Sequence, residues 1–476
     1  MFRFISILLL LAVNTTTFAD EPIRLRNCRP QLQKLEKRKG LRAPQYSEAS
    51  RNKFIGEHRQ LVVLVSFSDQ SFREEEPLTL WNRIFNEEHL NESPFVGSVH
   101  DYFYDQSYGK LSLTFDLQLV ELNESRIKYR STSTDDENSK YLVYDIVDEL
   151  STRDIDWSVY DWDKDYYIDQ LLIIYAGKGQ NAGGGSNSIW PHQWWLSMHE
   201  NGESRTITYN EKDYIIDSYC CVQEIYSNDD YGSFGTICHE YSHCFGLPDF
   251  YYSGTSYVRA WDLMDYGNNN GGGFRPCSYS SHERMLMGWL MPTELTEAST
   301  ITNIPQLEEE PIAYLIRNDG WANEYYIVEN RQQTGWDESL PGSGLVVFHV
   351  DYDADIWKNS MPNSNKRKRY TIIPANNKTS VYQSSGWPYP YEDNNQLTND
   401  SEPAATLLNA NSDGTMLMNK PLTNICVTGG LASFDFIVGT TNIKEVTTNG
   451  SQLLYRFGML DIMRDAKGNI YKVIRK

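Results

Sequence analysis

The most informative segment of the sequence is His239-Glu240-Tyr241-Ser242-His243-Cys244-Phe245-Gly246-Leu247-Pro248-Asp249. Two histidines four positions apart on a helix project from one face, so both imidazoles can reach one zinc ion. Glu240 lies beside them, where a carboxylate can take a proton from an attacking water and pass it to a leaving amine. The five-residue pattern alone has chance matches, because two histidines on a helix are usually just solvated.

The residues after His243 make the pattern more specific. Gly246 lets the chain leave the helix in a left-handed turn, and Asp249 follows three residues later. A carboxylate oxygen can serve as the third zinc ligand and leaves a fourth position for water, whereas the alternative for Asp249 is an ordinary turn residue. We therefore expect zinc ligands at His239, His243 and Asp249, with Glu240 activating a zinc-bound water.

A second feature lies downstream, at Trp261-Asp262-Leu263-Met264-Asp265-Tyr266-Gly267. A long zinc motif followed by a methionine-containing turn resembles the metzincins, and the order H-E-x-x-H-x-x-G-L-x-D resembles the immune inhibitor A (M6) family of metallopeptidases. The resemblance implies that Met264 is a structural residue beneath the zinc. It also implies that Tyr266 can stabilise the oxyanion of a tetrahedral intermediate, the alternative being a buried core tyrosine.

The resemblance extends over roughly residues 60 to 440. Ser98 to Gly109 looks like the block before the family's catalytic core, and Met287-Gly288-Trp289 looks like the segment that closes it. The segment from Leu340 to Asp351 resembles the β domain that follows. The implied fold is α+β: a metzincin-like zinc protease domain, with a mixed twisted sheet and an active-site helix, followed by a β-sandwich domain.

The N-terminal region has the pattern of an exported protein. Arg3 and the apolar run from Phe4 to Val13 predict a signal peptide over residues 1–19. The basic segment over residues 20–59 suggests a pro-segment that docks on an acidic body, although a tail of no consequence is an equal alternative. No later segment has the ~20 continuous apolar residues of a transmembrane helix, so we expect a secreted or cell-surface location.

Hydrophobic periodicity divides the rest of the chain. Gln60–Phe67 and Asp169–Ala176 read as buried strands, and Tyr141–Leu150 and Ser233–Phe245 as helices. The predicted domains are a catalytic domain over residues 60–295, a β-sandwich over 296–439 and a tail or small β segment over 440–476.

An acidic loop, Asp161-Trp162-Asp163-Lys164-Asp165-Tyr166-Tyr167-Ile168-Asp169, places carboxylates at alternate positions before a strand. This spacing resembles a calcium loop, with Asp161, Asp163, Asp165 and Asp169 as possible ligands. Tyr166 occupies the place of the usual glycine and no bidentate glutamate follows, so a solvated acidic turn is the alternative.

Cys28 is the one cysteine of seven that falls in the predicted pro-segment. Its thiolate could occupy the open zinc position and hold the enzyme latent, and the flanking Arg26 and Arg29 would lower its pKa. A disulfide to the body or an unpaired thiol are the rival interpretations.

These features favour a secreted zinc-dependent endopeptidase, made as a latent proenzyme, that cleaves proteins or peptides and is inhibited by its own pro-segment. The formal net charge of -21 argues against a nucleic-acid partner, and nothing in the sequence indicates the oligomeric state. A catalytically silent adhesion protein is disfavoured because Glu240 and all three ligands are present. A thermolysin-like site with Glu283 as third ligand would leave Gly246 and Met264 without a purpose.

Overall fold

The computed structural model describes residues 52–132, 136–226, 230–359, 362–438, 452–457, 460–464, 467 and 470–474. The predicted signal peptide, most of the predicted pro-segment and Cys28 lie outside these residues. Contacts divide the chain into one compact unit that ends at Phe436 and a second unit that begins at Ile437. No helix within the described residues is long and apolar enough to cross a membrane.

A five-stranded sheet forms the centre of the first half of the chain, in the order β2-β1-β3-β7-β4. Its neighbouring strands are parallel except at the edge, where β4 runs antiparallel to β7. Because β1 begins at Gly56, residues 56–59 of the predicted pro-segment pair with β2 in this sheet. The strands are β1 (Gly56–Ser66), β2 (Leu111–Glu121), β3 (Leu171–Lys178), β4 (His192–Trp195) and β7 (Ser218–Ile225), and β5 (Arg205–Tyr209) and β6 (Lys212–Ile216) form a separate hairpin.

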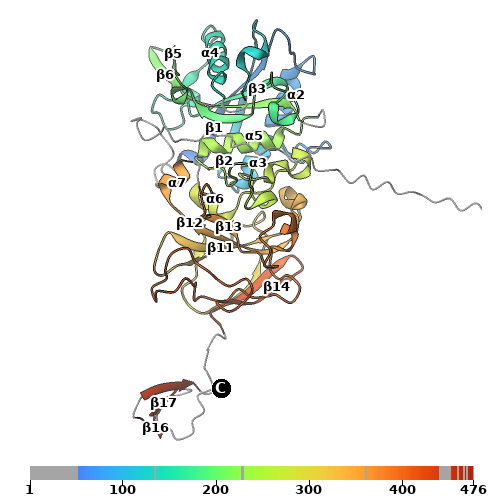
Figure 1. Ribbon diagram of the computed structural model, residues 1–476. Helices are drawn as coiled ribbons and strands as arrows, with labels where there is room; N and C mark the ends of the chain where they lie inside the picture. Colours follow the sequence, from blue (N-terminus) through green and yellow to red (C-terminus); the bar gives the residue numbers. More distant parts are fainter. Residues whose placement is uncertain are drawn as a thin grey trace, which may run out of the picture. The chain divides into compact units, whose positions relative to one another are not determined.

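The continuous apolar run in β1 reflects a sheet that is covered on both faces. Successive side chains of a strand point to opposite faces, and here Val62 and Leu64 enter one hydrophobic core while Leu61 and Val63 enter another. Figure 1 shows one helix above the sheet and others below it. The helix above is α4 (Ser139–Leu150), and those that pack on the opposite face are α2 (Pro77–Asn86), α3 (Val99–Gln106) and α5 (Phe234–Ser242).

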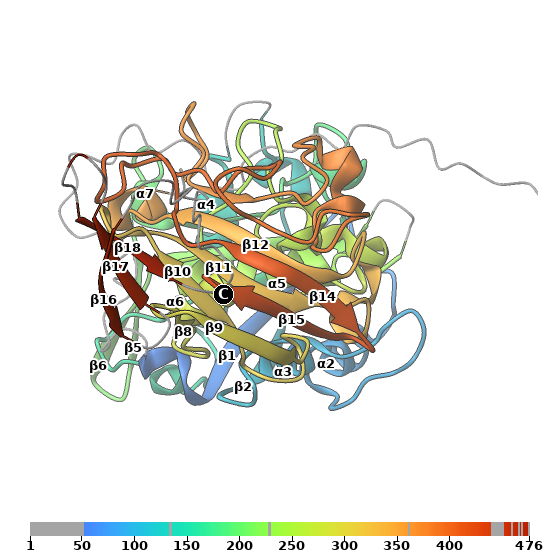
Figure 2. The same ribbon diagram turned by 90° about the horizontal axis from the view of Figure 1, so that it is seen from below.

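A second five-stranded sheet, in the order β13-β12-β11-β10-β8, follows in the chain, together with a three-stranded sheet, β14-β15-β9. Figure 2 shows β14 and β15 lying over β11 and β12, and the rings of Tyr314 and Phe434 meet edge to face with centroids 5.7 Å apart. The elements are α6 (Ser281–Leu286), β8 (Thr293–Glu294), β9 (Ser299–Ile304), β10 (Tyr314–Arg317), β11 (Glu324–Arg331), β12 (Gly344–Asp351), α7 (Ala354–Lys358), β13 (Tyr370–Ile372), β14 (Leu422–Thr428) and β15 (Leu431–Phe436).

One hydrophobic core joins the two five-stranded sheets. It includes Ile174 of β3, Cys238 of α5, Ile327 of β11 and Phe348 of β12. In Figure 1, α5 and α3 lie between the two sheets, and every residue of α5 is buried. The fold is therefore mixed α and β, and it encloses the helix that carries the histidine motif.

The second unit contains a three-stranded antiparallel sheet, β16 (Gln452–Phe457), β17 (Leu460–Arg464) and β18 (Ile470–Ile474). These strands fall within the segment 440–476, where the sequence predicts a tail or a small β segment.

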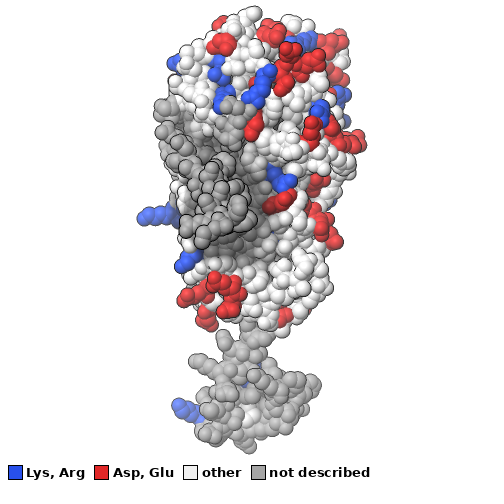
Figure 3. Space-filling view, turned by 90° about the vertical axis from the view of Figure 1, so that its right-hand side faces the viewer, with Lys and Arg blue, Asp and Glu red and all other residues white. Residues whose placement is uncertain are grey.

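On the surface shown in Figure 3, acidic and basic side chains are interspersed. The described atoms on this face present no continuous basic tract.

Candidate metal centre

The histidine motif lies at the C-terminal end of α5. The α-helix passes into a 3₁₀ turn at His243–Phe245, and Gly246 ends it with φ of 87°. The left-handed region costs a glycine nothing, because it has no Cβ to clash with the following carbonyl. The chain therefore reverses immediately after the second histidine, as the sequence predicts, and returns Asp249 to the same place.

Both histidines are oriented by backbone carbonyls. The Nδ1–H of His239 donates to the carbonyl of Leu263 at 2.8 Å, and that of His243 donates to the carbonyl of Leu247 at 2.7 Å. A carbonyl can only accept, so each Nδ1 carries a hydrogen and each Nε2 is directed toward Asp249.

Three ligand atoms converge at this point. Asp249 Oδ1 lies 3.3 Å from His239 Nε2 and 3.4 Å from His243 Nε2. Two ligands of a tetrahedral zinc, each about 2.0–2.1 Å from the ion, are separated by about 3.3 Å. The donor set and its spacing thus fit a zinc ion held by two imidazoles and one carboxylate, with a fourth position for water.

The charges at the centre are strongly coupled. Burial alone would lower the pKa of His239, but the hydrogen bond to Asp249 and the negative charges of Glu240 and Asp249 raise it to about 9. Burial alone would raise the pKa of Asp249, but the two imidazoles hold it well below its usual range. Asp249 is therefore an ionised, buried carboxylate, which is the form that binds a cation.

Glu240 lies in the same buried group. A carboxylate oxygen of Glu240 and a ring nitrogen of each histidine lie within 4.8 Å of one another, and Glu240 is only 3% exposed. The ring of Tyr251 stacks on His239, with centroids 6.2 Å apart. The sequence alone does not mark Tyr251, whose only local signal is its position two residues after Asp249.

The turn that contains Met264 is built into the centre. Met264 is fully buried, its N–H donates to Asp262 Oδ1 at 2.8 Å, and its carbonyl accepts from the N–H of Phe250 at 2.8 Å. Because Leu263 accepts the hydrogen bond from His239, this turn contacts the motif helix and the segment after Asp249.

Tyr266 is partly buried and is fixed by Arg259. Its N–H donates to the Arg259 carbonyl at 3.1 Å, and the Arg259 guanidinium lies 5.0 Å from the centroid of its ring. The same guanidinium lies 4.9 Å from the ring of Tyr382, which is 82% exposed. Tyr266 is thus held by a cation–π contact at the end of the methionine turn.

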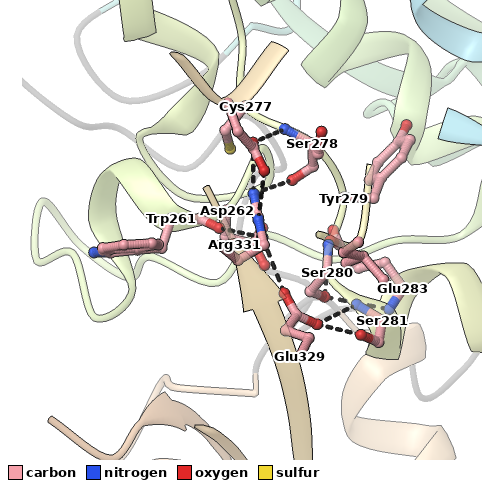
Figure 4. A network of polar contacts seen from close by, with 12 residues as sticks. Trp261, Asp262, Cys277, Ser278, Tyr279, Ser280, Ser281, Glu283, Glu329 and Arg331 are labelled. Atoms are coloured by element: carbon pink, nitrogen blue, oxygen red, sulfur yellow. Dashed lines mark hydrogen bonds and ion pairs between the residues drawn. The ribbon is translucent and has the colours of Figure 1, made fainter. Parts of the chain in front are cut away.

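Glu283, the alternative third ligand, is used elsewhere. Its Oε2 accepts from the N–H of Ser280 at 2.8 Å and from the Ser280 hydroxyl at 3.0 Å, in the network of Figure 4. The N–H of Glu283 donates to Ser280 Oγ at 3.3 Å, and together with the bond from the Ser280 N–H this forms the capping box that starts α6. The structure places Asp249, not Glu283, against the two histidines.

The acidic loop is only partly assembled as a cation site. Asp161, Asp163 and Asp169 each offer an oxygen within 4.8 Å of the others, whereas Asp165 Oδ1 accepts from the N–H of Tyr167 at 2.8 Å. Lys53, which no local pattern in the sequence connects with the loop, directs its ammonium into this group, 2.9 Å from Asp169 Oδ1 and 3.8 Å from Asp163 Oδ2. A positive charge of the chain itself therefore already pairs with two of the three carboxylates.

Comparison with known proteins agrees with the geometry. The sequence profile described as immune inhibitor A peptidase M6, catalytic domain, matches residues 45–289. The chain is 26% identical over 292 residues to immune inhibitor A of Bacillus thuringiensis subsp. alesti, covering 50% of this chain and 41% of that protein. It is 30% identical over 182 residues to the pre-pro-metalloprotease PrtV of Vibrio cholerae serotype O1 (strain M66-2), covering 33% of this chain and 19% of that protein.

The aligned region thus spans less than half of the length of either relative. The profile match nevertheless covers more than half of this chain and includes the whole histidine motif, Asp249 and the turn at Met264. The chain belongs to the immune inhibitor A family of M6 peptidases.

Proposed function

We propose that the protein is a zinc-dependent endopeptidase that hydrolyses peptide bonds in proteins. The observation that carries the proposal is the convergence of His239 Nε2, His243 Nε2 and Asp249 Oδ1 at separations of 3.3 and 3.4 Å, with Glu240 beside them. Family membership and the name of the relative PrtV, a metalloprotease, support the same chemistry.

The zinc ion and the side chains around it have separate roles in the proposed reaction. When bound, zinc supplies a Lewis acid that polarises the scissile carbonyl and makes water acidic. Glu240 takes the proton of the attacking water and returns it to the leaving amine. The burial of Glu240 beside the histidines supports this role. We assign Tyr266 to the oxyanion, supported by its position two residues after Met264 in the turn at the centre.

Casein cleavage with and without a chelator tests the proposal. Cleavage is expected to stop with chelator and return with zinc, and Glu240→Gln is expected to bind zinc but lose at least about 100-fold in kcat, as general-base removal does. Glu211→Gln, in the exposed turn between β5 and β6, is the matched control with full activity. Cleavage by Glu240→Gln at the control rate would rule out this mechanism, and no cleavage by any processed form would favour the silent adhesion protein.

We further propose export as a latent proenzyme. Three observations support this: the signal-peptide pattern over residues 1–19, the basic segment over 20–59, and the name of the relative PrtV, a pre-pro-metalloprotease. Cys28 is proposed to block the zinc position until the pro-segment is removed. Cys28→Ser is expected to give a proform that activates early, and an unchanged activation rate would contradict the switch.

The finer architecture is also a proposal. The buried Met264, next to the Leu263 carbonyl that accepts from His239, supports a metzincin-like catalytic domain, and the contact of Tyr314 with Phe434 supports a β-sandwich in the second half. Calcium at Asp161, Asp163 and Asp169 stays a prediction, and the Lys53 ammonium competes for the same oxygens.

A further inference from the structure

We propose that the second sheet completes the metal centre, and that Tyr370 of β13 is the positioning residue through which it does so. The inference rests on the proposed zinc site, since Tyr370 acts on residues that hold the ligands. It concerns how firmly zinc is held, and can therefore be tested apart from peptidase activity.

The hydroxyl of Tyr370 supports the methionine turn. It donates to Asp262 Oδ2 at 2.7 Å and lies 2.8 Å from Ser280 Oγ. The other oxygen of Asp262 accepts the N–H of Met264 at 2.8 Å, so the carboxylate links the second sheet to this turn. The carbonyl that orients His239 belongs to Leu263, between Asp262 and Met264.

The ring of Tyr370 supports the third ligand. It stacks on Phe250, with centroids 3.8 Å apart and planes 17° from parallel, and Phe250 directly follows Asp249. Asn363 fixes this contact, because its Nδ2 donates to the carbonyls of Phe250 at 2.9 Å and Tyr370 at 2.8 Å.

One side chain therefore contacts both segments on which the ligand geometry depends. Tyr370, Phe250 and Asp262 are all fully buried, so these contacts exclude water and leave little freedom for either segment. Residues that orient metal ligands typically change metal affinity by about 10–100-fold when they are replaced. An ordinary core tyrosine would contribute to stability alone.

The test compares the full chain with three variants in zinc affinity, measured by chelator competition, and in the visible spectrum of the cobalt-substituted protein. Tyr370→Phe removes the hydroxyl and keeps the stacked ring, and Tyr370→Leu removes both. The matched control is Tyr326→Phe on β11, which removes another buried hydroxyl, 2.6 Å from the carbonyl of Thr406. Thermal unfolding of the metal-free proteins separates stability from positioning.

Tyr370→Phe is expected to raise the zinc dissociation constant about tenfold and to shift the cobalt bands. Its melting temperature is expected to equal that of the Tyr326→Phe control. Tyr370→Leu is expected to raise the constant about 100-fold. Equal zinc affinities and identical cobalt spectra for Tyr370→Phe and Tyr326→Phe would overturn the inference. If Tyr370→Phe melts at a lower temperature than the control, the zinc affinity of Asn363→Ser is measured instead. Weaker zinc binding by Asn363→Ser supports the positioning role, and unchanged zinc binding overturns the inference.

The two proposals fail in different ways. A wild-type protein that binds zinc but cleaves nothing contradicts the peptidase function, while the zinc comparison among the variants still stands. A wild-type protein that binds zinc and cleaves casein, with Tyr370→Phe equal to the control in both respects, contradicts only the positioning role.

Discussion

The nitrogen that carries the hydrogen decides whether each histidine can bind a metal. The carbonyls of Leu263 and Leu247 hold the Nδ1–H of His239 and His243, and so direct each Nε2 to Asp249. In the metal-free protein, the same carboxylate favours the protonated form of His239. Zinc and a proton therefore compete for one nitrogen.

This competition predicts a pH dependence of zinc binding. The pKa of His239 is raised to about 9, so the proton must leave before zinc binds, and zinc affinity is expected to rise about tenfold from pH 7 to pH 8. The stability of the metal-free protein changes with pH in the opposite direction. Protonated His239 stabilises the fold below the unfolded-state pKa of about 6.5, and this stabilisation is lost as pH rises through the folded-state pKa of about 9. Chelator competition at the two pH values measures the slope.

Asp249→Asn is the control for this effect, because it removes the hydrogen-bonded carboxylate and one of the two negative charges that raise the pKa of His239, and leaves Glu240 in place. The variant is expected to bind zinc more weakly and to show a smaller change in zinc affinity between pH 7 and pH 8 than wild type. A wild-type affinity that is equal at both pH values would contradict the assigned competition.

Lys53 gives a second prediction at this scale. Lys53→Met removes the ammonium from Asp163 and Asp169 and should leave a site that a divalent cation can fill. Calcium is expected to raise the melting temperature of this variant more than that of wild type or of Lys378→Met, an exposed control. The same calcium response in all three proteins would show that Lys53 does not stand in for the ion.

The sequence predicts those parts of the site whose partners are close in the chain. His239, His243 and Asp249 form one local motif, and the geometry brings all three together. Lys53 and Asp169 are 116 positions apart, and Tyr370 and Asp262 are 108 apart. No local spacing marks such pairs, because they meet only when the sheets pack.

Among the elements, α5 matters most for the site, because the way this helix ends sets the position of Asp249. It is buried on all sides, so its position is fixed by packing, but the return of Asp249 depends on Gly246, with φ of 87°. Strands β1 and β3 and helices α4 and α5 agree with the predicted segments, since each has a strong local period. Strand β2 is missing from the predicted segments, although its sequence alternates apolar Leu111, Leu113 and Phe115 with polar residues, which is a local strand pattern.

Gly246→Ala tests the turn. Forcing an alanine into the left-handed region costs about 1–2 kcal/mol, and the resulting shift should also weaken zinc binding. Gly414→Ala is the matched control, since Gly414 has φ of 81° and an added Cβ would meet no atom within 4 Å. Both variants are expected to lose similar stability in urea unfolding, but only Gly246→Ala should lose zinc affinity. Equal zinc affinities would mean that the turn does not position Asp249.

In the whole molecule, the two five-stranded sheets share one hydrophobic core, and the domain bounds of residues 60–295 and 296–439 stay a prediction. Local patterns identify apolar faces but do not say which faces meet. Ile327 of β11 belongs to the same core as Ile174 of β3, and β8, before the predicted boundary, pairs with β10 after it. Arg331 reinforces the junction, because it is fully buried and binds Asp337. It also donates to the carbonyls of Ser278 and Trp261 (Figure 4).

Arg331→Met is therefore expected to destabilise the whole unit. It leaves the buried carboxylates of Asp337 and Glu329 without their cation, which costs about 3–5 kcal/mol. Arg317→Met breaks an exposed pair with Glu294 and should cost at most about 1 kcal/mol. Urea unfolding measures both, and a loss in Arg331→Met no larger than in the control would contradict a role for this network in joining the sheets.

The most direct test of the zinc site is an anomalous difference map, recorded at the zinc absorption edge, from crystals of the full chain. We expect one strong peak about 2.0–2.2 Å from His239 Nε2, His243 Nε2 and an Asp249 oxygen, and its loss in Asp249→Ala. A peak bound by Glu283 instead of Asp249, or no peak at the two histidines of protein saturated with zinc, would contradict it.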